Sequence, residues 1–228
     1  MIGFQRIDRY LAAELFRGYA VVAAVLLAAG IADGVLVRNA MAAVDAFYAR
    51  LDSFMPPGST PPQDPARSGS ATSLVAWGDL GSAGRAFVSR MPSGREIAAF
   101  WGEPAVDPVR VYVGLGSAGS VGERARLALG ELIRVGGFER SLLVVSTPTG
   151  TGFMEEAAIA PLEYLHRGAV ATVGMQYSYL QSPFSLLFEP GYGAGSARAL
   201  SSASRNRVAA RTSSARASGH RVKTSAVS

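Results

Sequence analysis

Residues 142–152 read Leu-Leu-Val-Val-Ser-Thr-Pro-Thr-Gly-Thr-Gly, and this stretch decides the fold class. Four consecutive apolar residues are typical of a strand that is buried on both faces, as the strands of parallel sheets are. The hydroxyl- and glycine-rich residues that follow predict a loop. Because α/β proteins place their sites at the carboxyl ends of parallel strands, this loop is a candidate site.

Two more strand-like segments flank this stretch along the chain. Residues 108–113 read Pro-Val-Arg-Val-Tyr-Val and alternate as a strand does. Residues 169–175 form another short apolar run, which predicts a second buried strand.

Helical patterns separate the three predicted strands. Ser120 and Glu123 have the spacing of a capping box, and the apolar stripe that follows them ends at Gly136. Residues 155–165 predict a second helix, which Pro161 should kink or shorten. Strands that alternate with helices in this way predict an α/β fold with a parallel sheet.

An apolar run lies near the N-terminus. Residues 18–32 carry no charge, and if Asp33 lies near a membrane interface the run continues to Val37. About twenty such residues, at 1.5 Å each, cross the roughly 30 Å hydrocarbon core of a bilayer. The run has no polar face at helical spacing, so we predict a transmembrane helix and the lipid bilayer as a partner. Two alternatives are a signal peptide cleaved after Ala32 and a buried helix of a soluble protein.

The residues on either side of this run predict its orientation in the membrane and the segments that follow it. Arginines are slightly more frequent before the run than after it, which favours a cytoplasmic N-terminus and an external body. Residues 39–54 have the pattern of a short amphipathic helix, so residues 1–55 are predicted to be a membrane anchor with a juxtamembrane helix. Residues 56–72 contain five prolines and predict a semi-extended linker to the body, residues 73–200.

The net positive charge of the chain comes from its C-terminal part. Up to Glu189 there are 15 arginines and 17 acidic residues, whereas the seven cations beyond it have no acidic counterpart. Residues 201–228 contain almost no large apolar side chain, so they are predicted to be a disordered basic tail. Without aromatic residues or a fold, this tail does not predict nucleic-acid binding.

Metal and cofactor sites are not predicted. The chain has no cysteine, and its two histidines, His166 and His220, have no partner at ligand spacing. Residues 114–119 read Gly-Leu-Gly-Ser-Ala-Gly between a strand and a helix, which is the context of a dinucleotide fingerprint. However, the helix starts after the last glycine, and the next strand ends in Ser146-Thr147 instead of an acidic residue that would bind ribose. Nucleotide binding therefore stays a lesser alternative to a strand-to-helix turn.

Residues 176–180, Gln-Tyr-Ser-Tyr-Leu, leave the third strand in the same direction as the loop that begins at Thr147. Tyr177 and Tyr179 are therefore candidates for a substrate wall, with an aromatic cap on the core as the alternative. No serine in the chain has glycine at both −2 and +2, as the nucleophile elbow of an α/β-hydrolase requires. No catalytic residue is predicted for this reason.

Four strings together resemble a bacterial family of membrane-anchored enzymes, alpha/beta-hydrolase family 9. They begin at Arg110, Leu142, Pro161 and Met175 and read Arg-Val-Tyr-Val-Gly-Leu, Leu-Leu-Val-Val-Ser-Thr-Pro-Thr-Gly-Thr-Gly, Pro-Leu-Glu-Tyr-Leu-His and Met-Gln-Tyr-Ser-Tyr-Leu. The resemblance implies a bacterial cytoplasmic membrane, a serine-hydrolase activity on esters or lipids, and no cofactor. It also implies that the loop after residue 146 gives one oxyanion-hole amide, with Thr149, Gly150 and Thr151 as the candidates.

The resemblance fades near Leu200, before any nucleophile elbow. We therefore expect the first half of a parallel-sheet hydrolase domain in a catalytically incomplete chain, with residues after 200 that read like a frame-shifted sequence. The alternatives are a non-enzymatic membrane protein of the same fold and the nucleotide-binding domain. If a reactive serine exists, Ser117 and Ser146 are the first places to look, because both lie in loops at strand ends.

Overall fold

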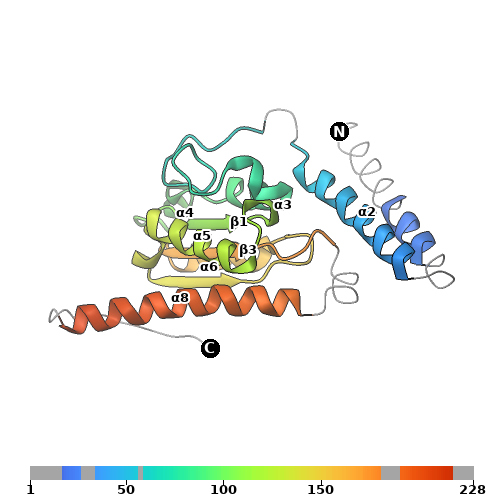
Figure 1. Ribbon diagram of the computed structural model, residues 1–228. Coiled ribbons are helices and arrows are strands. Elements are labelled where there is room, and N and C mark those ends of the chain that lie inside the picture. Colours follow the sequence, from blue (N-terminus) through green and yellow to red (C-terminus); the bar gives the residue numbers. More distant parts are fainter. Residues whose placement is uncertain (1–16, 27–33, 56–58, 181–190, 218–228) are drawn as a thin grey trace, which may run out of the picture. The chain divides into compact units, whose positions relative to one another are not determined.

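The computed structural model describes residues 17–26, 34–55, 59–180 and 191–217. The chain divides into two compact units, of which the first ends at Arg50 and the second begins at Leu51. Figure 1 shows the elements of both.

The first unit contains a helix over residues 17–26 and most of α2 (Gly34–Ser53). Val22, Val44 and Tyr48 are its buried apolar side chains. A Cβ atom on Gly18 would lie 3.4 Å from the hydroxyl of Tyr48, so the two helices are in contact there.

The membrane prediction has a mixed outcome. The predicted span falls partly on residues 27–33, which lie outside the described residues, and its last four residues belong to α2. The amphipathic helix predicted over residues 39–54 is thus present but begins at Gly34. Within the described residues, no helix combines the length and the apolar character that a membrane span needs.

The second unit is built on a parallel three-stranded sheet, as predicted. Its strands are β1 (Val109–Val113), β2 (Leu142–Ser146) and β3 (Val170–Met175), and the order across the sheet is β1-β3-β2. Val111 pairs with Val173, and Val144 with Thr172. The central strand, β3, is buried at every position, as is the edge strand β1, whereas β2 is half-buried.

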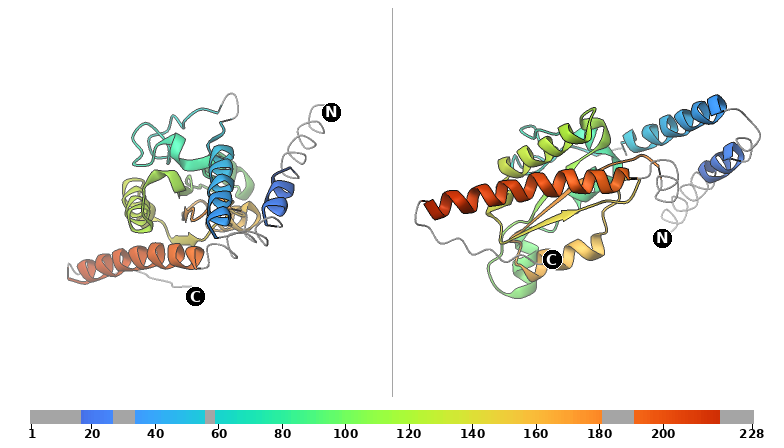
Figure 2. Two further views of the ribbon diagram at one scale, coloured as in Figure 1. Left: turned by 45° about the vertical axis from the view of Figure 1, so that its right-hand side comes forward. Right: turned by 60° about the horizontal axis from the view of Figure 1, so that its bottom comes forward.

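Helices cover both faces of the sheet (Figure 2). The elements of the second unit, besides the strands, are η1 (Trp77–Leu80), α3 (Gly81–Ser89), α4 (Gly94–Trp101), η2 (Leu115–Ser117), α5 (Val121–Arg134), η3 (Gly137–Glu139), α6 (Glu156–Leu165) and α8 (Tyr192–Ala217). Helices α5 and α8 pack together and against the sheet, whereas α3 contacts β1 and α6 contacts β3. The capping box predicted at Ser120 is formed, and Ser93 forms another at the start of α4.

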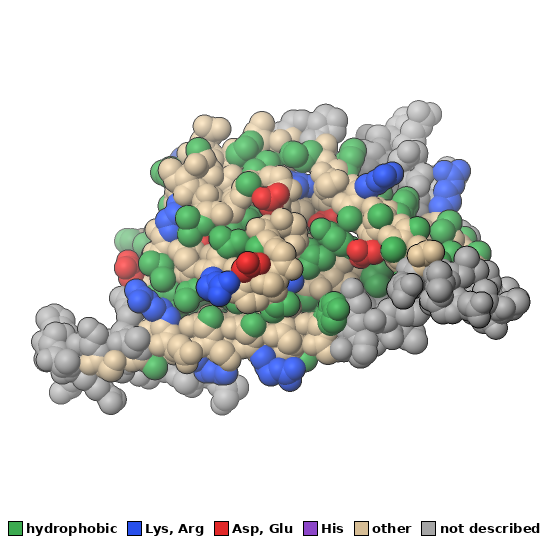
Figure 3. All heavy atoms as spheres, viewed as in Figure 1, with side chains coloured by type: hydrophobic (Ala, Val, Ile, Leu, Met, Phe, Trp, Pro, Cys, Tyr) green, Lys and Arg blue, Asp and Glu red, His purple; other side chains and the backbone are tan. Residues whose placement is uncertain are grey.

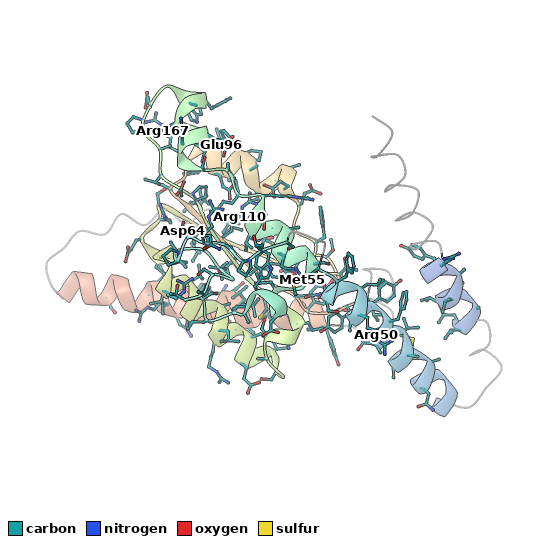
Figure 4. The ribbon with its side chains drawn as sticks, turned by 90° about the horizontal axis from the view of Figure 1, so that it is seen from above. Arg50, Met55, Asp64, Glu96, Arg110 and Arg167 are labelled. Atoms are coloured by element: carbon teal, nitrogen blue, oxygen red, sulfur yellow. The ribbon has the colours of Figure 1, made fainter. Side chains whose placement is uncertain are left out.

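Arg110 of β1 joins the sheet to α3 and α6, and it lies in the interior of this unit (Figure 4). Its guanidinium forms a bidentate ion pair with Glu163 at 2.7 and 2.8 Å, contacts both oxygens of Glu156, and donates to the carbonyl of Phe87 at 2.9 Å. All five N–H donors are thereby used. Burial alone lowers the pKa of Arg110, but the hydrogen bonds and charges of the two glutamates outweigh it and raise the pKa above its usual value.

The predicted linker is attached to the body. Arg134 of α5 donates to the carbonyl oxygens of Pro65 and Arg67, and Glu131 accepts from Ser68. The described residues 59–72 are therefore not a free spacer; side chains of α5, about sixty residues away in sequence, hold part of this segment in place.

The predicted disorder after residue 200 is wrong for residues 201–217, which belong to α8. Leu200 and Ser204 of this helix are buried. Alanine and arginine are strong helix formers, so the composition that argued against a core still favours a helix that packs through a few residues. The remaining residues, 218–228, lie outside the described part of the chain.

Candidate functional site

The loops after the three strands leave the sheet at one edge, because parallel strands have their carboxyl ends on the same side. They begin at Gly114, Thr147 and Gln176. This edge is where the sequence places the candidate site.

Gln176 joins these loops. Its backbone amide donates to Val113 at 2.9 Å, and its side-chain oxygen accepts from the amide of Leu115 at 3.1 Å. Its side-chain nitrogen lies 3.1 Å from the carbonyl oxygen of Ser178 and 3.5 Å from that of Thr151. The side chain is 1% exposed, so it holds the three loops together from within.

The loop after β2 forms a tight turn. The amide of Gly152 donates to the carbonyl of Thr149 at 2.9 Å, and the amide of Thr149 donates to the carbonyl of Phe153 at 3.0 Å. The hydroxyl of Tyr112, fully buried on β1, donates to the carbonyl of Gly152 at 2.7 Å. Burial, and secondarily the charge of Asp52, raise the pKa of Tyr112 well above its usual value, so this hydroxyl stays protonated.

Asp52, near the end of α2, approaches the same edge. Its carboxylate accepts from the amide of Ser82 at 3.0 Å and from the Ser82 hydroxyl at 3.2 Å, and it lies 3.4 Å from the side-chain nitrogen of Gln176. Arg85 donates to the carbonyl oxygens of Asp52 and Phe54. These bonds fix the start of α3 relative to the loops of the sheet edge.

A groove of about 360 Å³ runs between α3 and the loop after β2. We call it the α3 groove; its lining residues are Ser82, Ala83, Ala86, Phe87, Arg90, Thr151, Phe153, Met154 and Glu156. Its volume lies at the small end of the range for ligand sites.

The three oxyanion candidates differ in their surroundings. The amide of Thr149 donates to the carbonyl of Phe153. Gly150 is buried and already takes part in another contact. The amide of Thr151 donates to none of the residues that the structure describes, and Thr151 lines the α3 groove. Of the three, only Thr151 both lines the α3 groove and has an amide without a partner among the described residues.

The predicted substrate wall lies elsewhere. A Cβ atom on Gly193 of α8 would meet the ring of Tyr177 at 3.2 Å, and one on Gly116 would lie 3.9 Å from the hydroxyl of Tyr179. Neither tyrosine lines the α3 groove. The structure therefore joins Thr151 to Gln176 of this segment but not to its two tyrosines.

The glycine-rich loop after β1 is closely packed. A Cβ atom on Gly114 would lie 1.9 Å from the carbonyl oxygen of Asp79, and the hydroxyl of Ser117 donates to the same oxygen at 3.2 Å. A pyrophosphate needs this approach for itself, so the loop has the geometry of a packed strand-to-helix turn. Gly119 ends the loop just before the capping box of Ser120.

No catalytic pair or metal cluster is present among the residues that the structure describes. His166 caps α6 on the exposed surface, and no three acidic or histidine side chains there are arranged to hold a metal ion. Ser146 ends β2, and Ser117 is bonded to Asp79. Neither serine has a histidine within its described hydrogen bonds.

Three residues that hold this edge together were not among the predicted site residues: Gln176, Tyr112 and Asp52. Gln176 carried a signal, because a polar side chain directly after a buried strand in a parallel sheet faces the site. Asp52 carried none, since its contact with Gln176 spans 124 residues of sequence.

Comparison with known families accounts for most of the chain. A sequence model described as the alpha/beta-hydrolase family matches residues 109–219, and one described as the N-terminus of that family matches residues 2–92. The match continues past Leu200, where the resemblance was expected to end. No curated protein and no solved structure matches the chain.

Proposed function

The chain belongs to alpha/beta-hydrolase family 9, and from this premise we propose that it is a membrane-anchored, hydrolase-like protein that binds an ester without cleaving it. It supplies the oxyanion side of an ester-hydrolase site, and its own residues supply no nucleophile.

One observation carries the binding half of this proposal. Thr151 lines a groove beside the loops at the carboxyl edge of the parallel sheet, and its amide has no partner among the described residues. A backbone amide in such a place stabilises the negative charge that develops on a carbonyl oxygen during acyl transfer. Gln176 and Tyr112 hold the loop that carries it, so the donor is positioned before a ligand arrives.

The catalytic half rests on the residues of the chain. None of its serines has the two flanking glycines of a nucleophile elbow. An oxyanion hole and binding site without a triad accelerate hydrolysis by at most about 10³–10⁴-fold over water in the serine proteases where this was measured. We therefore propose that the chain does not turn over esters as an enzyme does.

Hydrolysis of p-nitrophenyl butyrate tests this proposal. The chain and its Ser117→Ala/Ser146→Ala variant should release p-nitrophenol at the same rate, close to that of buffer with an unrelated protein. Turnover that either serine substitution abolishes would refute the proposal. Absence of both turnover and ester binding would favour a non-enzymatic membrane protein of the same fold.

The anchor is part of the proposal. The uncharged run over residues 18–32 supports a membrane helix, and the arginine bias supports an external body. The full chain should stay with membranes after a carbonate wash. A soluble protein that begins at Asp33 would instead identify the run as a cleaved signal peptide.

A further inference from the structure

We propose that the α3 groove binds the uncharged hydrocarbon chain of a short acyl ester, with the ester carbonyl at Thr151 and with Ala86 setting the chain length. This inference rests on the proposed function and gives its site a substrate class.

The two ends of the groove are identified by their bonds. Ser82 and Thr151 mark one end, because Ser82 donates to Asp52 and Gln176 lies between Asp52 and Thr151. Phe87 and Glu156 lie toward the other end, where Arg110 binds both. Arg90 follows Phe87 by one helical turn and completes this end.

One face of α3 forms a wall of the groove. The lining residues on this side recur at the three- and four-residue spacing of a helix face: Ser82, Ala83, Ala86, Phe87 and Arg90. From Ser82 to Arg90 the helix advances by about 12 Å at 1.5 Å per residue. This length suits a chain of several carbons and is too short for a long fatty acyl chain.

The chemistry of the wall changes along this length. The middle is apolar, with Ala86 and Phe87 on α3 opposite Phe153 and Met154. The far end carries Arg90 and Glu156, which have opposite charges, and Glu156 is already paired with Arg110. A charged ligand tail would gain little from such an end and would lose its hydration, so the groove favours an uncharged chain.

Alanine keeps the groove open. Ala83 and Ala86 are small residues between Ser82 and Phe87, and a large side chain at position 86 would occupy the space opposite Met154. Ala86 is therefore the residue that determines which chain lengths enter.

Methionine-methyl NMR provides a direct test on the full chain. The chain should be reconstituted in lipid nanodiscs, because the alkyl chains of detergents would compete for the groove. Met154 lines the α3 groove, and Met91 lines a separate cavity of about 270 Å³ that includes the start of β1. Met154→Leu assigns the signal, and Met91 is the internal control.

Methyl hexanoate should shift the Met154 methyl resonance in a saturable way and leave Met91 unchanged. Methyl acetate should bind at least about tenfold more weakly, since each buried methylene contributes to affinity. Ala86→Phe should abolish the shift, whereas Ala99→Phe, on the exposed face of α4, should not.

An unmoved Met154, equal shifts at both methionines, equal binding of the two esters, or binding that survives Ala86→Phe would each overturn the inference. The Met154 and Met91 signals of the unsubstituted chain decide the case even if Ala86→Phe fails to fold. The outcome is separate from that of the turnover assay. Esters that bind and are cleaved would refute the catalytic half of the proposed function. Esters that bind but leave the Met154 signal unmoved would refute the groove alone, and esters that neither bind nor react would refute both the groove and the binding half of the proposed function.

Discussion

Gly152, in the loop after β2, occupies a position that only glycine fits without strain. Its φ is +87°, a conformation that side chains other than that of glycine rarely adopt. A Cβ atom there would lie 2.3 Å from the hydroxyl oxygen of Tyr112 and 3.1 Å from the side chain of Gln176. The close approach exists because Tyr112 donates to the carbonyl of Gly152 itself.

Gly152→Ala should therefore lower the free energy of unfolding by about 2–4 kcal/mol, since backbone strain and overpacking add. Gly102→Ala is the matched control, because Gly102 also has a positive φ, +68°, but its Cβ would meet nothing within 4 Å. This control should cost about 1 kcal/mol. Urea unfolding followed by tryptophan fluorescence reports on the second unit, which contains both tryptophans, Trp77 and Trp101. Equal losses would show that the contact with Tyr112 contributes nothing.

Glu131 of α5 holds the end of the predicted linker and the residues after it through hydrogen bonds. Its fully buried carboxylate accepts from Ser68 at 3.0 Å, from Ser73 at 2.7 Å and from the amide of Leu74 at 3.0 Å. Arg134 donates two further bonds to it, at 2.8 and 2.7 Å. Burial alone raises the pKa of Glu131, but these donors outweigh it, so the pKa lies below the usual value.

Glu131→Gln should lower the free energy of unfolding by about 1.5–3 kcal/mol at pH 7, the range for hydrogen bonds to a charged group. A carboxyl with a depressed pKa in the folded state stabilises the protein above its unfolded pKa of about 4.3. This contribution is lost as the pH falls through the lower, folded-state pKa. The difference between the chain and the variant should thus be constant from pH 7 to 5 and shrink below pH 4. The exposed Glu139→Gln should change the free energy of unfolding by under about 0.5 kcal/mol. A difference for Glu131→Gln that is as large at pH 3 as at pH 7 would contradict the role of its charge.

At the scale of elements, the sheet was predictable and the α8 helix was not. The apolar runs near Val111, Val144 and Val173 identify strands that local sequence determines, and their alternation with helices implies parallel pairing. The register and the central place of β3 depend on long-range packing, which local patterns do not encode. The segment over residues 201–217 has few large apolar residues, yet it is helical, because alanine and arginine favour a helix and α8 packs on α5 and the sheet through part of its length.

Leu200 makes the contribution of α8 measurable. It is 2% exposed and belongs to the main core, whereas Val208 on the same helix is 36% exposed. Leu200→Ala should destabilise the second unit by about 2–5 kcal/mol, and Val208→Ala should change it by under about 0.5 kcal/mol. Rapid amide exchange along α8, with no loss of stability in Leu200→Ala, would show that the helix is not part of the fold.

The candidate site was only partly predictable for a related reason. The position of the loop after β2 follows from the strand that precedes it, and Thr151 of this loop lines the α3 groove. Tyr177 and Tyr179 follow a strand at the same edge, but their rings lie near Gly193 and Gly116. Strand direction predicts where a loop starts, whereas the packing of later elements decides where its side chains point.

At the scale of the whole molecule, charge and apolar character are separated along the chain. The uncharged run over residues 18–32 lies near one end, and α8, which carries arginines and no acidic residue, lies near the other. Figure 3 shows cationic side chains along α8 with no anionic ones among them. The hydrolase-family body lies between these two segments in the sequence, and the α3 groove lies beside one edge of its sheet.

We propose that this body has the oxyanion side of a hydrolase site and no activated serine. Labelling of the full chain with a fluorophosphonate probe tests it most directly, because the probe reports an activated serine whatever the substrate is. The chain should show no label above that of the Ser117→Ala/Ser146→Ala variant. Stoichiometric labelling that a single serine-to-alanine substitution abolishes would contradict it.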